Sequence, residues 1–207
     1  FLNKKFKKIL IIILPIIIFL SIFLIIFNNK TAKNFKIGNT KSSQEIINNI
    51  LNISSYETQI EVEVKSNKNS NKYIIKQKYI KPAILEQEII EPENIKGLKV
   101  IKDKEGMKIE NTRIGLTKIF GGYKEVIGNY LDLVNFIEEY KENPRAKCEE
   151  KNNELIMKTE NNKGSKYQKY KELYIDIKTG KPTKLEIKDN NKQEVVYILY
   201  NKVELNI

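Results

Sequence analysis

The sequence predicts an α+β fold: a curved antiparallel β-sheet that forms a half-barrel, with helices packed in its concave face and an N-terminal transmembrane helix. Apolar and polar residues alternate over most of residues 56–111 and 173–205, which is typical of strands with one buried face. The connections within each stretch are short. Because parallel strands need crossovers of a dozen or more residues, these connections favour an antiparallel meander.

The first thirty residues predict the membrane anchor. An uncharged, strongly apolar run covers residues 9–27, and about 20 helical residues suffice to cross a bilayer. Lysines precede the run, so the positive-inside rule places the preceding residues in the cytoplasm and everything after Asn28 outside it. No small-residue cleavage motif follows, which favours an uncleaved anchor over a cleaved signal sequence. We therefore expect an anchor at 1–30, a polar tether at 31–41 and an extracytoplasmic domain at 42–207 of a single-pass cell-membrane protein.

The composition excludes several kinds of chemistry. The chain has 207 residues and no histidine, which removes the usual general base, the usual zinc ligand and the Ser-His-Asp triad. Its one cysteine, Cys148 in "RAKCEE", cannot form an internal disulfide and is interpreted as a small buried strand residue rather than a reactive thiol.

The net charge of +11 raises the question of nucleic-acid binding. Acidic residues are interspersed with the lysines after residue 44, and an extracytoplasmic domain does not meet chromosomal DNA. The basic, tyrosine-rich "KGSKYQKYKELY" (163–174) is therefore interpreted as a solvated sheet face, with an anionic lipid or wall polymer as a minor alternative. No nucleic acid is expected as a partner.

The domain begins with a helix and then switches to strands. "SSQEIINNILNI" places Ser42 as N-cap with Glu45 three residues later, and its isoleucines fall at helical spacing. "YETQIEVEVKS" places Tyr56, Ile60 and Val62 on one face of a strand. "KYIIKQKYI" and "AILEQEIIE" return as further strands, and "LKVIKDKEGMKIEN" forms a hairpin about Glu105-Gly106.

The middle of the chain breaks this pattern. "RIGLTKIFGGYKEVIGN" has four glycines and no clean period, which predicts a loop with short helical pieces. "NYLDLVNFIEEYKENP" predicts a helix that is capped by Asn129 and followed by Pro144. Its broad apolar stripe comprises Tyr130, Leu133, Val134, Phe136, Ile137 and Tyr140.

The closing strands provide a surface for that stripe. "LYIDIK" and "KLEIK" are apolar on one face, whereas "VVYILY" is apolar on both. A strand of the latter kind is central and covered on both sides, or has one side lining a cavity. A flat open sheet of about eight or more strands would curl, which leads to the half-barrel.

These closing residues, "LYIDIKTGKPTKLEIKDNNKQEVVYILYNKVELN", resemble the LolA/LolB-like lipoprotein-carrier superfamily, as does "KPAILEQEIIEPENIKGLKVIKDKEGMKIEN". Within it, "IFGGYKEVIGNYLDLVNFIEEYKEN" is similar to the family of GerS, the clostridial spore-germination lipoprotein. The resemblance covers residues 42–207. It implies a non-enzymatic sporulation or germination factor that binds and licenses a spore-cortex amidase, forms homodimers by strand exchange and resides in a compartment such as the forespore intermembrane space. Here a transmembrane helix stands where GerS has a lipidated cysteine.

Two other functions remain open at this stage. The half-barrel is a candidate for holding an acyl lipid or lipoprotein, and Tyr130, Phe136, Ile137 and Tyr140 then line the hollow rather than plug it. A glycosidase needs two carboxylates, for which Glu61/Glu63 and Glu86/Glu88 are candidates, although they are also ordinary solvated strand positions. We assign no catalytic, cofactor or metal residue. For the partner surface, an exposed strand edge and the middle loop are candidates without assigned contact residues.

Overall fold

The computed structural model describes residues 42–66, 68–82, 84–111, 113–121, 131–161 and 166–206. The chain divides into two units, 1–40 and 41–207, and the described residues all belong to the second. The expected anchor and tether lie outside them. Within the described ranges, no helix is both long and apolar enough to cross a membrane.

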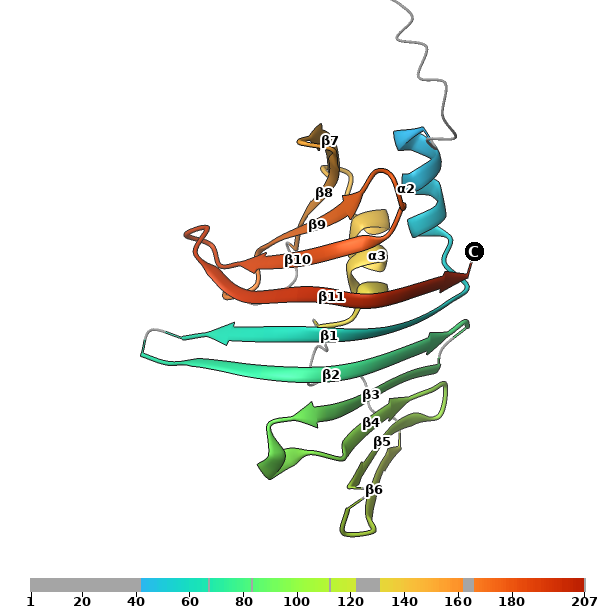
Figure 1. Cartoon of the computed structure of the whole chain (residues 1–207), viewed down its shortest axis with the longest axis vertical. Coiled ribbons are helices and arrows are strands. Elements are labelled where there is room, and N and C mark those ends of the chain that lie inside the picture. Colours follow the sequence, from blue (N-terminus) through green and yellow to red (C-terminus); the bar gives the residue numbers. More distant parts are fainter. Residues whose placement is uncertain are drawn as a thin grey trace, which may run out of the picture. The chain divides into compact units, whose positions relative to one another are not determined.

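The described residues form one antiparallel sheet of eleven strands (Figure 1). Its order is β6-β5-β4-β3-β2-β1-β11-β10-β9-β8-β7, so two meanders are joined where β1 pairs with β11. The first meander contains β1 (Ser55–Lys65), β2 (Ser70–Ile80), β3 (Ile84–Glu91), the 3-10 helix η1 (Glu93–Ile95), β4 (Leu98–Lys102), β5 (Gly106–Asn111) and β6 (Leu116–Gly121). The second contains β7 (Lys147–Lys151), β8 (Glu154–Glu160), β9 (Tyr170–Asp176), β10 (Pro182–Lys188) and β11 (Glu194–Asn206).

The register brings apolar side chains into continuous rows across the sheet. Val62 lies opposite Ile198, Ile198 opposite Leu185, Leu185 opposite Leu173, and Leu173 opposite Met157. All five side chains are at most 1% exposed. Because successive residues of a strand point to opposite faces, the alternation in the sequence places this whole row on one face. The predicted antiparallel sheet is confirmed.

Helix α2 (Ser43–Leu51) begins where the sequence predicts. The Ser42 hydroxyl accepts a hydrogen bond from the backbone N–H of Glu45 at 3.2 Å, which satisfies a free donor of the first turn. Ile46 and Ile50 are fully buried in the same core as the strand row. Ile46 and Ile50, which are one helical turn apart, therefore attach this short helix to the sheet.

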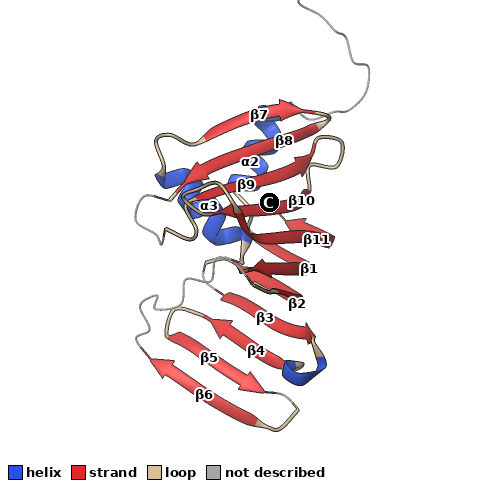
Figure 2. Ribbon diagram, turned by 90° about the vertical axis from the view of Figure 1, so that its left-hand side faces the viewer, coloured by secondary structure: helices blue, strands red, loops and turns tan. Residues whose placement is uncertain are grey.

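Helix α3 (Leu133–Glu142) begins later than predicted. Its N-cap is Asp132, whose carboxylate accepts from the N–H of Asn135 at 2.6 Å, and not Asn129, which lies outside the described residues. Asparagine and aspartate are about equally good N-caps, so the sequence alone does not tell which of the two begins the helix. α3 connects β6 and β7, the two opposite edges of the sheet, and packs on the same face as α2 (Figures 1 and 2).

One prediction for the middle of the chain is wrong. Residues 116–121 form strand β6 rather than a loop, and they pair with β5 from Asn111 opposite Leu116 to Gly121 opposite Gly106. The alternation in "LTKIF" is too short to stand out beside the surrounding glycines. Gly115, in the preceding turn, has a φ of +65°, a conformation that favours glycine. Residues 122–129 lie outside the described ranges.

Candidate functional site

The space between α3 and the sheet was one of the expected binding sites. Phe136 is 1% exposed and Ile137 is 6% exposed, and both belong to the core with the strand row. Tyr140 is half-buried, with its ring centroid 5.9 Å from that of Phe136, whereas Tyr130 lies outside the described residues. The described members of the stripe therefore fill the space they cover, as expected of a structural plug.

A buried lysine fastens α3 to the sheet. Lys171 on β9 is 1% exposed, and its Nζ lies 2.7 Å from Glu139 and donates to Asn135 Oδ1 at 2.9 Å. Burial lowers the pKa of Lys171, and the Glu139 carboxylate opposes that shift. The interpretation of 163–174 as a solvated face missed this residue, because one lysine in a tyrosine- and lysine-rich stretch gives no sign that it faces inward.

Titratable groups also gather at the start of α3. Asp132 is 4% exposed, and burial raises its pKa to about 6. Tyr200 is 7% exposed, and among the described residues its hydroxyl has no hydrogen-bond partner. Burial, followed by the nearby Asp132 charge, raises the pKa of Tyr200. The two groups lie beside the first turn of α3, so we expect the stability of this region to depend on pH.

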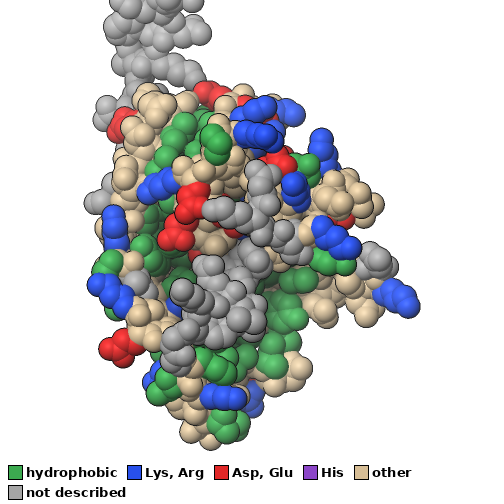
Figure 3. All heavy atoms as spheres, turned by 180° about the vertical axis from the view of Figure 1, so that it is seen from behind, with side chains coloured by type: hydrophobic (Ala, Val, Ile, Leu, Met, Phe, Trp, Pro, Cys, Tyr) green, Lys and Arg blue, Asp and Glu red, His purple; other side chains and the backbone are tan. Residues whose placement is uncertain are grey.

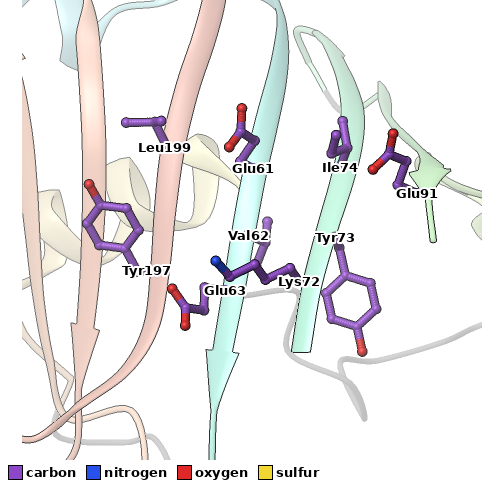
Figure 4. A pocket seen from close by; sticks show the side chains of 9 residues that line it. All are labelled: Glu61, Val62, Glu63, Lys72, Tyr73, Ile74, Glu91, Tyr197 and Leu199. Carbon is purple, nitrogen blue, oxygen red and sulfur yellow. The ribbon is translucent and has the colours of Figure 1, made fainter. Parts of the chain in front are cut away.

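The outer face, which is the face of the sheet without helices, carries both candidate glutamate pairs. Glu61 and Glu63 line a hollow of about 340 Å³ with Tyr197 and Leu199 (Figure 4). Glu63 accepts from Ser70 Oγ at 2.6 Å, which lowers its pKa. A glycosidase acid needs the opposite shift so that it carries a proton near neutral pH. Glu63 is therefore unsuited to that role.

The second glutamate pair belongs to a more open hollow of about 520 Å³. Glu86 lies 2.8 Å from Lys99 on the neighbouring strand, and Glu88 lines the same hollow. The geometry of Glu86 is that of a cross-strand ion pair.

Cys148 lies on β7, as expected for a strand residue, opposite Met157. It is half-buried, and burial raises the pKa of its thiol to about 11. Since the thiolate is the reactive form, this cysteine is a poor nucleophile. In the part of the chain that the structure describes, no three His, Cys, Asp or Glu side chains are placed to hold a metal ion.

The two edges of the sheet differ in character. Strand β7 reads "KCEEK", and Glu150 on it accepts from Ser43 of α2 at 3.0 Å. Strand β6 instead exposes Leu116 (59%) and Ile119 (72%), and Ile114 in the preceding turn is 71% exposed. Figure 3 shows apolar side chains, mixed with basic ones, at the end of the sheet formed by β4–β6.

The family comparison gives the architecture a context. The model of the family described as "Sporulation protein YdcC-like" matches residues 6–207. The chain belongs to this YdcC-like sporulation family. No curated protein sequence matches it.

Solved structures show the fold. The structure of the CwlD amidase from Clostridioides difficile in complex with the GerS lipoprotein matches with a TM-score of 0.53 and 22% identity, covering 84% of this YdcC-like chain and 99% of the matched chain. An uncharacterized conserved protein from Thermus thermophilus matches with a TM-score of 0.50 and 10% identity, covering 80% and 88%. A LolA superfamily protein, NE2245 from Nitrosomonas europaea, has a TM-score of 0.41 and 10% identity, covering 81% and 94%. The expected resemblance of the fold to that of the GerS complex structure is confirmed.

Proposed function

We propose that this YdcC-like protein is a membrane-anchored, non-enzymatic binding protein outside the cytoplasm that binds and licenses a spore-cortex peptidoglycan amidase. The observation that carries the proposal is the joint match to a sporulation family and to the fold of GerS, which is in complex with an amidase. At 22% identity the fold alone is shared, so the amidase partner is part of the proposal.

The described side chains support a binding role over chemistry. The lowered pKa of Glu63 disfavours a general acid there, Glu86 is engaged in an ion pair with Lys99, and the raised pKa of the Cys148 thiol disfavours a nucleophile. Phe136 and Ile137 occupy the space in which an acyl chain would lie, which counts against the lipid-binding alternative. In this proposal the catalytic groups belong to the partner.

The anchor at residues 9–27 gives the proposal a spatial limit. A tether of residues 31–41, fully extended at about 3.5 Å per residue, reaches no more than about 40 Å. The domain would then meet its partner close to the membrane surface, and release of the anchor would lower the local concentration of the licensing protein.

The proposal predicts that the amidase needs this protein. The full chain, purified in detergent micelles, is mixed with the CwlD-type amidase of the same organism, and the peptides released from cortex peptidoglycan are measured. We expect product only when both proteins are present. Full activity of the amidase alone, or product from this protein alone, would contradict the licensing role.

A further inference from the structure

We infer that the β6 edge of the sheet accepts an extended segment of the partner protein by strand addition, and that this segment carries an aliphatic side chain beside Ile119 and an acidic side chain beside Lys118. The inference deepens the proposed function, because it rests on a protein partner and says where and how that partner docks.

The first argument is backbone availability. Among the described residues, β6 pairs with β5 alone, whereas every strand from β5 to β8 along the sheet order pairs on both sides. Every second residue of an edge strand directs its N–H and C=O groups away from the sheet, and another chain readily pairs with them.

The second argument is the contrast with the other edge. β7 carries Lys147, Glu149, Glu150 and Lys151, all exposed, and natural proteins use such charges to block pairing at an edge. β6 has a single charge, Lys118, and its more exposed large apolar side chain is Ile119. One edge is thus protected from strand addition and the other is not.

The third argument is the arrangement of side chains on β6. Ile119 lies opposite Lys108, Lys108 opposite Ile101, and Ile101 opposite Glu86, which the outer face carries. Ile119 is therefore on the outer face, while Leu116 and Lys118 point to the other face by the strand's period of two. A partner strand beside β6 would cover Ile119 from one face and meet Lys118 from the other.

The fourth argument is charge. In the β5–β6 hairpin, Lys108 pairs with Glu110 and Arg113 lies 3.0 Å from Glu93. Lys118 makes no ion pair with any described residue, and its Nζ lies 4.9 Å from the centre of the Phe120 ring. Because opposite charges on adjacent strands stabilise a pair and like charges destabilise it, an acidic residue fits beside Lys118.

The test uses two synthetic probes and the full chain in detergent micelles. One peptide alternates valine and glutamate, and the control peptide alternates valine and lysine. Hydrogen exchange followed by mass spectrometry locates the protected amides. We expect the glutamate peptide to slow exchange at residues 116–121 at least fivefold and to bind at least tenfold tighter than the lysine peptide.

Three variants give the test its controls. Ile119→Lys should weaken glutamate-peptide binding at least tenfold. Ile80→Lys changes an exposed isoleucine of the interior strand β2 and should leave binding unchanged. Lys118→Glu should reverse the preference toward the lysine peptide. Equal binding of both peptides, protection at 147–151 instead of 116–121, or equal effects of the two isoleucine variants would overturn the inference.

Three further outcomes test this inference, and the last two separate it from the proposed function. If the unliganded chain is a dimer with residues 116–121 already protected, a second copy occupies the edge and the inference fails. If the amidase binds Ile119→Lys as tightly as the unmodified chain, the inference fails while the licensing proposal stands. If the glutamate peptide protects β6 but the amidase does not bind at all, the edge is confirmed and the licensing proposal falls.

Discussion

Lys171 shows how one residue fixes the relation between helix and sheet. It occupies an inward position among apolar neighbours on β9, where an unpaired cation would be expensive, and Glu139 and Asn135 of α3 satisfy it. The pair therefore ties the position of α3 to β9 more specifically than apolar contact alone. Neither member of the pair is distinguishable in the sequence from the many surface lysines and glutamates around it.

Removing this cation should loosen α3. Lys171→Met removes the cation beside the Glu139 carboxylate, which is only 17% exposed and keeps the hydrogen bond that it accepts from Asn161 Nδ2. We expect a loss of about 1–3 kcal/mol in the free energy of unfolding, below the cost of breaking a fully buried pair because Glu139 reaches water. Urea unfolding of the full chain measures this loss of stability. Lys169→Met, which removes the half-exposed pair with Glu160, is the control and should cost about 0.5 kcal/mol or less. Equal effects of the two substitutions would contradict this account of Lys171.

Asp132 predicts a pH dependence of stability. Its folded pKa of about 6 lies above the ordinary 3.8, so the folded state holds this proton to higher pH than the unfolded state does. The resulting contribution is fully present below about pH 3.8 and is lost as the pH rises through about 6. Two pKa units correspond to about 3 kcal/mol.

The variant Asp132→Asn isolates that contribution, because asparagine also caps helices well. Urea unfolding at pH 4 and pH 7 should show that the unmodified chain loses more stability across this interval than the variant does, by up to about 3 kcal/mol. The same difference between the two pH values in both proteins would mean that Asp132 does not titrate in this range.

At the scale of elements, the sequence was most informative where patterns are long. The alternation in β1 and β9–β11 and the serine cap of α2 could be predicted because each depends on neighbouring residues alone. β6 could not, because a five-residue alternation bounded by glycines resembles a loop, and its pairing with β5 is what makes it a strand. The residue that caps α3 could not be predicted either, because it depends on where the helix packs against the sheet, and the local sequence does not show this.

The candidate site was less predictable than the fold for a related reason. Ile119 is exposed because it lies on β6, which is an edge strand. Which strand forms the edge depends on the complete strand order of the sheet. The sequence suggested an exposed strand edge as a contact surface, but it did not tell which edge is charged and which is apolar. Conversely, the rejected glutamate pairs were visible in the sequence, and their hydrogen bonds and ion pairs became visible only in the structure.

The plug formed by α3 predicts a large effect of one apolar substitution. Phe136→Ala removes a ring that is 1% exposed within the core. We expect a loss of about 3–5 kcal/mol in the free energy of unfolding, since the cavity adds to the lost burial. Phe136→Leu, which keeps most of the volume, should cost clearly less. Thermal and urea unfolding compare them, and a near-neutral effect of Phe136→Ala would show that the ring is not part of the core.

At the scale of the whole molecule, the first and last strands of the described domain meet at the centre of the sheet. The β1–β11 ladder runs from Ser55 opposite Asn206 to Val64 opposite Val196 and joins the two meanders. The joined sheet leaves one charged edge, one apolar edge and one face covered by two helices. This distribution agrees with a protein that presents a surface to a partner rather than one that encloses a substrate.

The central claim is that this protein acts through a bound amidase. The most direct measurement is the native mass of the full chain, affinity-purified in detergent from sporulating cells of its own organism. The account predicts a stoichiometric complex whose additional mass is that of a CwlD-type amidase. A chain that carries only the mass of an acyl lipid would contradict the account and assign the protein a lipid-binding function instead.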